Sequence, residues 1–244
     1  MLDNQVQSKP TISLNDGPNH AIRVPLTAEP SQDVLDAIAA GKGIPVLDVG
    51  PYFAGAPNAL DQLAANLRVI QENIGFYCIV NHGVPREVIE DATEQTRQLF
   101  ALPEEEKQLS RAVFHHQGWW PPKSIVVNWS KLEHKHKQAT VEGWIFFRER
   151  EADDPKVLAN VRHRTVNKWP SAEHLPRFKP TMLRYIAEME TAARKMVRVY
   201  ARALELPETY FDAYFETPEF YQRCNYYAPG DPEIESMGMG AHSD

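Results

Sequence analysis

Residues 220–227 read Phe-Tyr-Gln-Arg-Cys-Asn-Tyr-Tyr, and residues 240–244 read Gly-Ala-His-Ser-Asp. The first stretch is rich in aromatic residues and predicts a β-strand, while the Pro-Gly-Asp-Pro segment that follows it predicts a loop. On a strand, residues i and i+2 project from the same face. His242 and Asp244 can therefore present an imidazole nitrogen and a carboxylate oxygen to one metal ion.

A third ligand is needed to complete such a metal site. A 2-His-1-carboxylate facial triad, which holds Fe(II) with three positions open, requires one more His beyond His242 and Asp244. Spacing alone favours the plain alternative, in which both residues lie on the surface after a glycine-rich turn. His134 and His136 also have strand spacing, but three lysines surround them and oppose a cation, which favours a solvated face.

Composition places the chain among soluble globular proteins. Of its 244 residues, 43% are hydrophobic and 24% are charged, which is enough to bury a substantial core. The net charge of -7 and the pI near 5.7 give no electrostatic footprint for nucleic acid. The sequence shows no apolar run of membrane-spanning length and no secretory signal, so we expect a cytoplasmic protein. Cys78 and Cys224 lie in apolar, strand-like sequence, which predicts two buried free thiols.

Periodicity and punctuation predict mainly helices in the first part of the chain. Ser31 is a candidate N-cap for a short helix that ends at Gly41, and Leu60 to Ile70 carry apolar residues on one helical face. Strands are expected within 44–49 and 75–83. Pro85 is expected at the first position of a helix that runs through Phe100.

The second part of the chain alternates helix and strand signals. A short helix is expected within 102–107, and the longest helical pattern opens at Pro180, faces inward through Met189 and Tyr200, and ends near Leu206. Residues 118–147 are aromatic-rich, and their large rings line either a substrate pocket or the core. These aromatics are Trp119, Trp120, Trp129, Trp144, Phe146 and Phe147.

Five motifs occur in one order: Ile44-Pro-Val-Leu-Asp-Val49, Gly75-Phe-Tyr-Cys-Ile-Val-Asn-His-Gly-Val84, Leu99-Phe-Ala-Leu-Pro-Glu-Glu-Glu-Lys107, Arg223-Cys-Asn-Tyr-Tyr-Ala-Pro229 and Gly240-Ala-His-Ser-Asp244. With them the chain resembles the isopenicillin N synthase-like Fe(II)/2-oxoglutarate dioxygenases from about residue 44 onward. The resemblance implies an α+β fold in which a helical N-terminal region packs on a double-stranded β-helix, or jelly roll, that is incomplete in this chain. The expected divisions are an N-terminal extension at 1–43, a dioxygenase N-terminal region at 44–180, and a long helix with the first part of the jelly roll at 181–244.

The resemblance also implies roles for four residues. His242 and Asp244 would be the first two iron ligands, and Asn225 and Tyr227 would lie beside the 2-oxoglutarate carboxylate. Fe(II) and 2-oxoglutarate would be the cofactor and cosubstrate, and a small organic molecule and O2 would be the other reactants. Asn225 and Tyr227 are at i and i+2, so both can face the barrel interior and donate hydrogen bonds to an anion in a dry pocket. The alternative is a core tyrosine beside an asparagine at a strand end.

The sequence departs from the family pattern after Asp244, because the second His ligand and the Arg-x-Ser clamp of the family lie downstream. We therefore expect the 244 residues alone to bind iron weakly and not to turn over. Two further interpretations stay open. One is an oxidase of the same fold that does not use 2-oxoglutarate, or an ethylene-forming relative. The other is a non-catalytic, truncated interaction protein. The residues carry no signal for the prime substrate or the oligomeric state.

Overall fold

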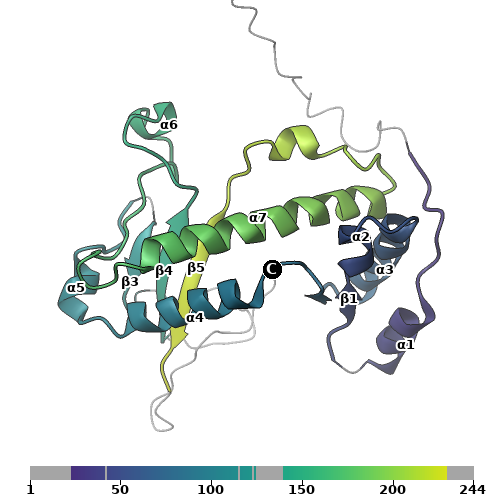
Figure 1. Ribbon diagram of the computed structural model, residues 1–244, viewed down its shortest axis with the longest axis horizontal. Coiled ribbons are helices and arrows are strands. Elements are labelled where there is room, and N and C mark those ends of the chain that lie inside the picture. Colours follow the sequence, from purple (N-terminus) through teal and green to yellow (C-terminus); the bar gives the residue numbers. More distant parts are fainter. Residues whose placement is uncertain (1–22, 42, 115, 123, 125–139, 230–244) are drawn as a thin grey trace, which may run out of the picture. The chain divides into compact units, whose positions relative to one another are not determined.

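The computed structural model describes residues 23–41, 43–114, 116–122, 124 and 140–229, and within them the fold is mixed α+β (Figure 1). The chain divides into two compact units, each built from two separate stretches. Unit 1 comprises 1–83 with 190–216, and unit 2 comprises 84–189 with 217–244. Among the described residues, no helix combines the length and apolar character needed to cross a membrane.

Unit 1 begins with helix α1 (Gln32–Ala40), as predicted. Ser31 is its N-cap in extended backbone geometry, although its side chain makes no capping hydrogen bond, and its backbone N–H is instead satisfied by Asn66. Gly41 ends the helix in the left-handed region at φ 58°, with its N–H donating to Ile38, a conformation that suits glycine because it has no Cβ.

A two-stranded parallel sheet follows, formed by β1 (Val46–Asp48) and β2 (Cys78–Val80), both inside the predicted stretches. Helices α2 (Gly50–Phe53) and α3 (Ala59–Asn73) connect the two strands. The expectation that Cys78 is buried is wrong, since its thiol is exposed. Side chains alternate along a strand, and Tyr77 and Ile79 take the core-facing positions on either side of it.

The core of unit 1 is aliphatic and includes Leu47, Leu67, Ile70 and Val199. At its edge the guanidinium of Arg202, with its side chain only 7% exposed, pairs with Asp61 at 2.8 Å. The hydrogen bond from Arg202 lowers the pKa of Asp61 to about 2, against the raising effect of burial. The same guanidinium donates to several backbone carbonyls, so this charge is both paired and hydrogen-bonded, as burial requires.

Unit 2 contains the second sheet. Its antiparallel strand order is β3 (Gly118–Trp120), β4 (Val141–Phe147) and β5 (Tyr221–Tyr227). Helices α4 (Arg86–Phe100), α5 (Glu104–Gln108) and α6 (Pro155–Leu158) belong to this unit. Pro85 is the N-cap of α4 and not its first helical residue, so the helix begins one position later than predicted.

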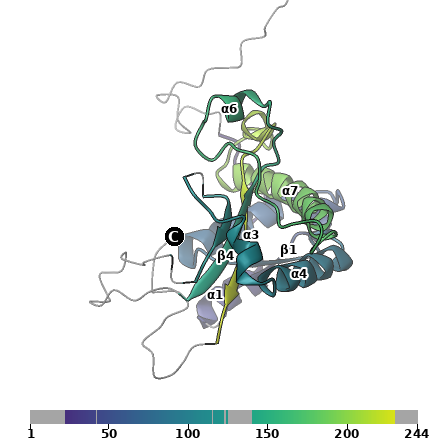
Figure 2. The same ribbon diagram turned by 90° about the vertical axis from the view of Figure 1, so that its left-hand side faces the viewer.

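One face of this sheet packs on helices. Figures 1 and 2 show α4 and the start of α7 on the same side of β4 and β5. The buried aromatics Trp119, Trp144 and Phe146 form the core there together with Cys224, the second cysteine, whose predicted burial is confirmed. Burial raises the pKa of the Cys224 thiol, and a hydrogen bond with Thr96 partly offsets that effect.

Helix α7 (Phe178–Ala203) contributes residues to both units, and a 3-10 helix (Asp212–Phe215) follows it. It starts two residues before Pro180, which still lies in the first turn, where a missing N–H costs nothing. The expectation that Met189 and Tyr200 face inward is wrong, because Met189 is 39% and Tyr200 is 36% exposed. The Tyr200 hydroxyl lies at the edge of unit 1, within hydrogen-bonding distance (2.8 Å) of the hydroxyl of Tyr77.

Candidate functional site

Strand β5 has two chemically different faces. Its register with β4 pairs Cys224 with Trp144, and both side chains enter the core. Because side chains alternate, the next residues on either side of Cys224 must point to the opposite face of the sheet. That face carries, from β5, Tyr221, Arg223, Asn225 and Tyr227. The helices therefore cover one face, and the other presents polar and aromatic groups.

Asn225 and Tyr227, which the sequence singles out, share this second face. Asn225 pairs in register with Gly143 and Tyr227 with Val141. Both side chains are exposed, so the described residues do not enclose them in the dry pocket expected from the sequence. Neither side chain makes a hydrogen bond to another described residue, which leaves an amide and a phenol available to a ligand.

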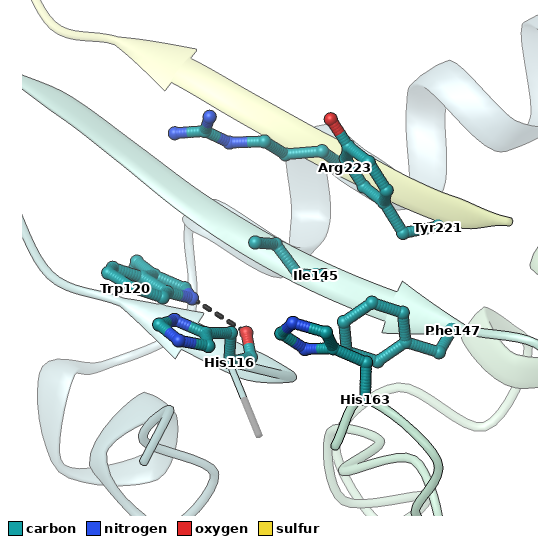
Figure 3. Close-up of a pocket in the computed structure, with 7 residues that line it drawn as sticks. All are labelled: His116, Trp120, Ile145, Phe147, His163, Tyr221 and Arg223. Carbon is teal, nitrogen blue, oxygen red and sulfur yellow. Dashed lines mark hydrogen bonds between the residues drawn. The ribbon is translucent and has the colours of Figure 1, made fainter. Parts of the chain in front are cut away.

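A cavity of about 440 Å³ lies on the same face of the sheet (Figure 3). It has a size typical of small-molecule sites. Its floor comes from β4 and β5, and its walls come from loops and the end of β3. The lining residues are His116, Trp120, Ile145, Phe147, His163, Tyr221 and Arg223.

Aromatic rings form a continuous wall of this cavity. His116 stacks on Trp120 with 5.3 Å between ring centroids and an interplanar angle of 9°, and the Trp120 indole N–H donates to the carbonyl of His116. His163 lies 5.4 Å from His116 and 5.3 Å from Phe147. Phe147 then meets Tyr221 edge-on at 6.4 Å. Such a wall offers ring faces and ring edges to an apolar ligand.

The two histidines of the wall have unusual backbone conformations. His116 has φ 65° and His163 has φ 62°, in the left-handed region. Non-glycine residues seldom adopt this conformation, and instances held in place by their surroundings cluster at functional sites. The guanidinium of Arg162 contacts Nε2 of His116 at 3.5 Å. Arginine only donates, so this contact fits an imidazole that accepts at Nε2 and carries its proton on Nδ1.

Arg223 is the permanent cation in the lining. Its side chain runs along the sheet from β5 over β4 (Figure 3). A Cβ added to Gly143 would lie 3.5 Å from Nε of Arg223 and 3.5 Å from Oδ1 of Asn225. The absence of a side chain at Gly143 thus leaves a shallow space between the guanidinium and the Asn225 amide. Nε of Arg223 is buried and finds no hydrogen-bond partner in the described part of the chain.

The predicted metal ligands His242 and Asp244 lie outside the described residues. Within the described ranges, no group of three or more His, Cys, Asp or Glu side chains is arranged to hold a metal ion. The described part of the site therefore consists of the groups that can contact organic ligands, namely β5, the aromatic wall and Arg223.

Residues 44–172 match the family described as non-haem dioxygenase in morphine synthesis N-terminal, a stretch that covers more than half of the chain. This chain belongs to the 2-oxoglutarate–Fe(II) oxygenase family. The chain is 26% identical over 201 residues to gibberellin 20 oxidase 1-D of Triticum aestivum, covering 82% of this chain and 52% of that protein. It is 27% identical over 205 residues to the 2-oxoglutarate-Fe(II) type oxidoreductase hxnY of Emericella nidulans, covering 82% and 58%.

The solved oxygenase structures share the fold of this chain. The crystal structure of JOX2 in complex with 2OG, Fe and JA superposes with a TM-score of 0.60 at 23% identity, covering 83% of this chain and 53% of JOX2. The family resemblance inferred from the sequence motifs is thus confirmed. The chain spans somewhat more than half the length of the curated relatives it matches first.

Sequence reasoning missed most of the cavity. Of the aromatics left between pocket and core, Trp120 and Phe147 line the cavity, while Trp119, Trp144 and Phe146 are core. Trp129 lies outside the described residues, as do His134 and His136. Arg223 had a detectable signal, because it lies two residues before Asn225 on the same strand. His163 had none, since a long loop brings it to the site.

Proposed function

We propose that this chain is part of a non-haem Fe(II)- and 2-oxoglutarate-dependent oxygenase that acts on a small organic substrate. The helical part and the sheet of unit 2 would belong to the N-terminal region and the first strands of a jelly roll. The observation that carries the proposal is the face of β5, where Asn225 and Tyr227 lie next to a small-molecule cavity in a chain of this family.

The side chains present fit an anionic cosubstrate. The Asn225 amide and the Tyr227 hydroxyl are neutral donors with no partner among the described residues, and both point to the cavity side of the sheet. A carboxylate accepts hydrogen bonds from such donors without the need to displace an existing partner. We assign Asn225 and Tyr227 to 2-oxoglutarate and His242 and Asp244 to Fe(II), with a further His required as third ligand.

The chemistry divides between cofactor and protein. When bound, Fe(II) and 2-oxoglutarate supply O2 activation, in which one oxygen atom enters succinate with loss of CO2 and the other oxidises the substrate. The chain's own part is to hold the cosubstrate on β5, to orient the substrate against the aromatic wall and to limit water around both.

The test is an anaerobic titration with Fe(II) and 2-oxoglutarate that follows the visible charge-transfer band of the chelate. A saturable band that is lost in Asp244→Ala supports the proposal. Tyr227→Phe should weaken 2-oxoglutarate binding about tenfold, the loss expected for one hydrogen bond to a charged group. Tyr226→Phe is the matched control, because Tyr226 lies on the helix-facing side and stacks on Phe100.

The other outcomes are equally informative. Iron binding without any response to 2-oxoglutarate would favour the oxidase of the same fold. Equal effects of Tyr227→Phe and Tyr226→Phe would contradict the assignment of the β5 face. Absence of both metal and cosubstrate binding in a protein that remains folded would favour the non-catalytic alternative.

A further inference from the structure

The cavity beside β5 combines one arginine with a wall of rings, and this combination points to a ligand class. We propose that it binds the prime substrate as a flat, mainly apolar carboxylic acid whose carboxylate pairs with Arg223. This inference rests on the proposed function for the identity of the site, and it adds the substrate class and the residue that selects it.

The guanidinium of Arg223 has a hydrogen-bond donor that no described residue satisfies. Its Nε is buried, yet no described residue accepts a hydrogen bond from it. No carboxylate pairs with Arg223 in the part of the chain that the structure describes, whereas most other arginines there have acidic partners. A buried donor without an acceptor is costly, more so when it is charged, and each such group calls for an explanation. Because the Arg223 side chain lines the cavity, a carboxylate bound there can pair with the Nη groups of the guanidinium and offset this cost.

The lining of the cavity carries a single fixed charge, which is positive. Among the seven lining residues there is one permanent cation, Arg223, and no aspartate or glutamate. The two Nη groups of a guanidinium lie side by side, a fork that matches the two oxygens of a carboxylate. A phosphate dianion would leave charge uncompensated beside a single arginine. The arrangement therefore favours a monoanion.

The wall of the cavity consists mainly of aromatic rings. The rings of Trp120, His116, His163, Phe147 and Tyr221 follow one another at centroid spacings of 5.3 to 6.4 Å (Figure 3). The rings are tilted against one another by 9° to 66°, and a planar apolar group packs favourably on the face or edge of any one of them. Ile145, between them on β4, adds an aliphatic floor. A flat body against the rings, with a carboxylate directed at β5, satisfies both parts of the cavity.

Position separates this ligand from the cosubstrate. Arg223 and Tyr221 line the cavity, whereas Asn225 and Tyr227 lie further along the same strand and are not among its lining residues. Residues i and i+2 on a strand are about 7 Å apart, so two anions can lie next to each other on one face. The guanidinium lies over Gly143, between these two positions.

The experiment is isothermal titration calorimetry on the purified protein without iron, with indole-3-acetate as probe and indole-3-acetamide as its uncharged counterpart. We expect the acid to bind saturably and at least tenfold more tightly than the amide. Arg223→Gln should weaken the acid about 10- to 100-fold, the range for charge-assisted hydrogen bonds, and leave the amide unchanged. Arg223→Lys should recover part of the loss, because it keeps the charge and loses the fork.

The matched control is Arg177→Gln, which removes the same charge from unit 2 at an exposed pair with Asp91. It should leave both affinities unchanged, and the tryptophan emission spectrum should show that all variants remain folded. Equal affinity for acid and amide would overturn the proposal, as would no saturable binding of the acid or equal losses in Arg177→Gln and Arg223→Gln.

One further arm separates this inference from the proposed function. If Arg223→Gln abolishes the response to 2-oxoglutarate and leaves indole-3-acetate binding intact, Arg223 belongs to the cosubstrate and the inference is wrong. If the acid binds through Arg223 while Fe(II) and 2-oxoglutarate do not bind, the substrate class stands and the oxygenase proposal fails.

Discussion

A buried ion pair holds the β3–β4 hairpin that carries Trp120. Nζ of Lys107 lies 2.8 Å from Oε1 of Glu142, and the two side chains are 10% and 7% exposed. The same carboxylate oxygen accepts the indole N–H of Trp119 at 2.6 Å, and the Lys107 ammonium also donates to the carbonyl of Phe100. We predict that Glu142→Gln destabilises unit 2 strongly.

The magnitude follows from the geometry. At an effective dielectric constant of about 20, two unit charges 2.8 Å apart attract by roughly 6 kcal/mol, while desolvation of each ion costs several kcal/mol. The intact pair is therefore worth little net. Glu142→Gln keeps a hydrogen bond from Trp119 but leaves the Lys107 charge buried and uncompensated, which costs about 3–5 kcal/mol in the free energy of unfolding.

Urea unfolding followed by tryptophan fluorescence measures this loss in unit 2, because all five tryptophans lie between residues 119 and 169. The double variant Lys107→Met/Glu142→Gln should lose about 2 kcal/mol less of the free energy of unfolding than the sum of the losses in the two single variants. The control is Glu87→Gln, an exposed partner of Arg184, which should show no measurable change. A loss below about 1 kcal/mol for Glu142→Gln, or strict additivity of the two changes, would refute the reasoning.

Three further predictions concern single residues. The hydrogen bond from Arg202 lowers the pKa of Asp61 to about 2, so the stabilisation by Asp61 is complete above about pH 4 and is lost as the pH falls towards 2. Asp61→Asn should cost about 2 kcal/mol of the free energy of unfolding at pH 7 and should reduce the fall of that free energy in acid, measured by urea unfolding and circular dichroism. An unchanged fall in acid would contradict this. Cys224 is buried and its pKa is raised by burial, so Ellman's reagent at pH 8 should label the exposed Cys78 quickly and Cys224 only after unfolding. Rapid labelling of both thiols in the folded protein would be inconsistent with the burial of Cys224. Gly118 has φ 97°, and a Cβ there would overlap the carbonyl oxygen of Ser110. Gly118→Ala should therefore lower the free energy of unfolding in urea by about 2–3 kcal/mol. An unchanged urea midpoint would contradict this prediction.

Local patterns were sufficient for most elements of the fold. The helix at Gln32–Ala40 follows from a cap residue, an apolar spacing and a glycine, all within ten residues of one another. The strand at Tyr221–Tyr227 follows from its aromatic content. These signals are local, and the predicted helix and strand form because the tertiary contacts favour the same secondary structure as the local sequence.

Errors arose where burial depends on distant partners. Cys78 lies in an apolar run, but its sheet has only two described strands, so one side of the run meets the core and the other does not. Met189 and Tyr200 continue the apolar stripe of α7. The helix has 26 residues and extends beyond each of the two cores to which it contributes side chains, so part of the stripe stays exposed. Periodicity indicates which face is apolar, and it cannot indicate how far along the helix a core extends.

The geometry of the candidate site follows from core packing. The pairing of Cys224 with Trp144 sets the register of β5 on β4, and that register places Arg223 opposite Ile145 and Asn225 opposite Gly143. Because the side-chain period of a strand is two, a shift of one residue would turn Arg223 into the core and Cys224 out of it. The aromatic core is thus what holds the guanidinium on the cavity side. A substitution on the helix-facing side that loosens this register should weaken ligand binding on the other side, although it touches no ligand.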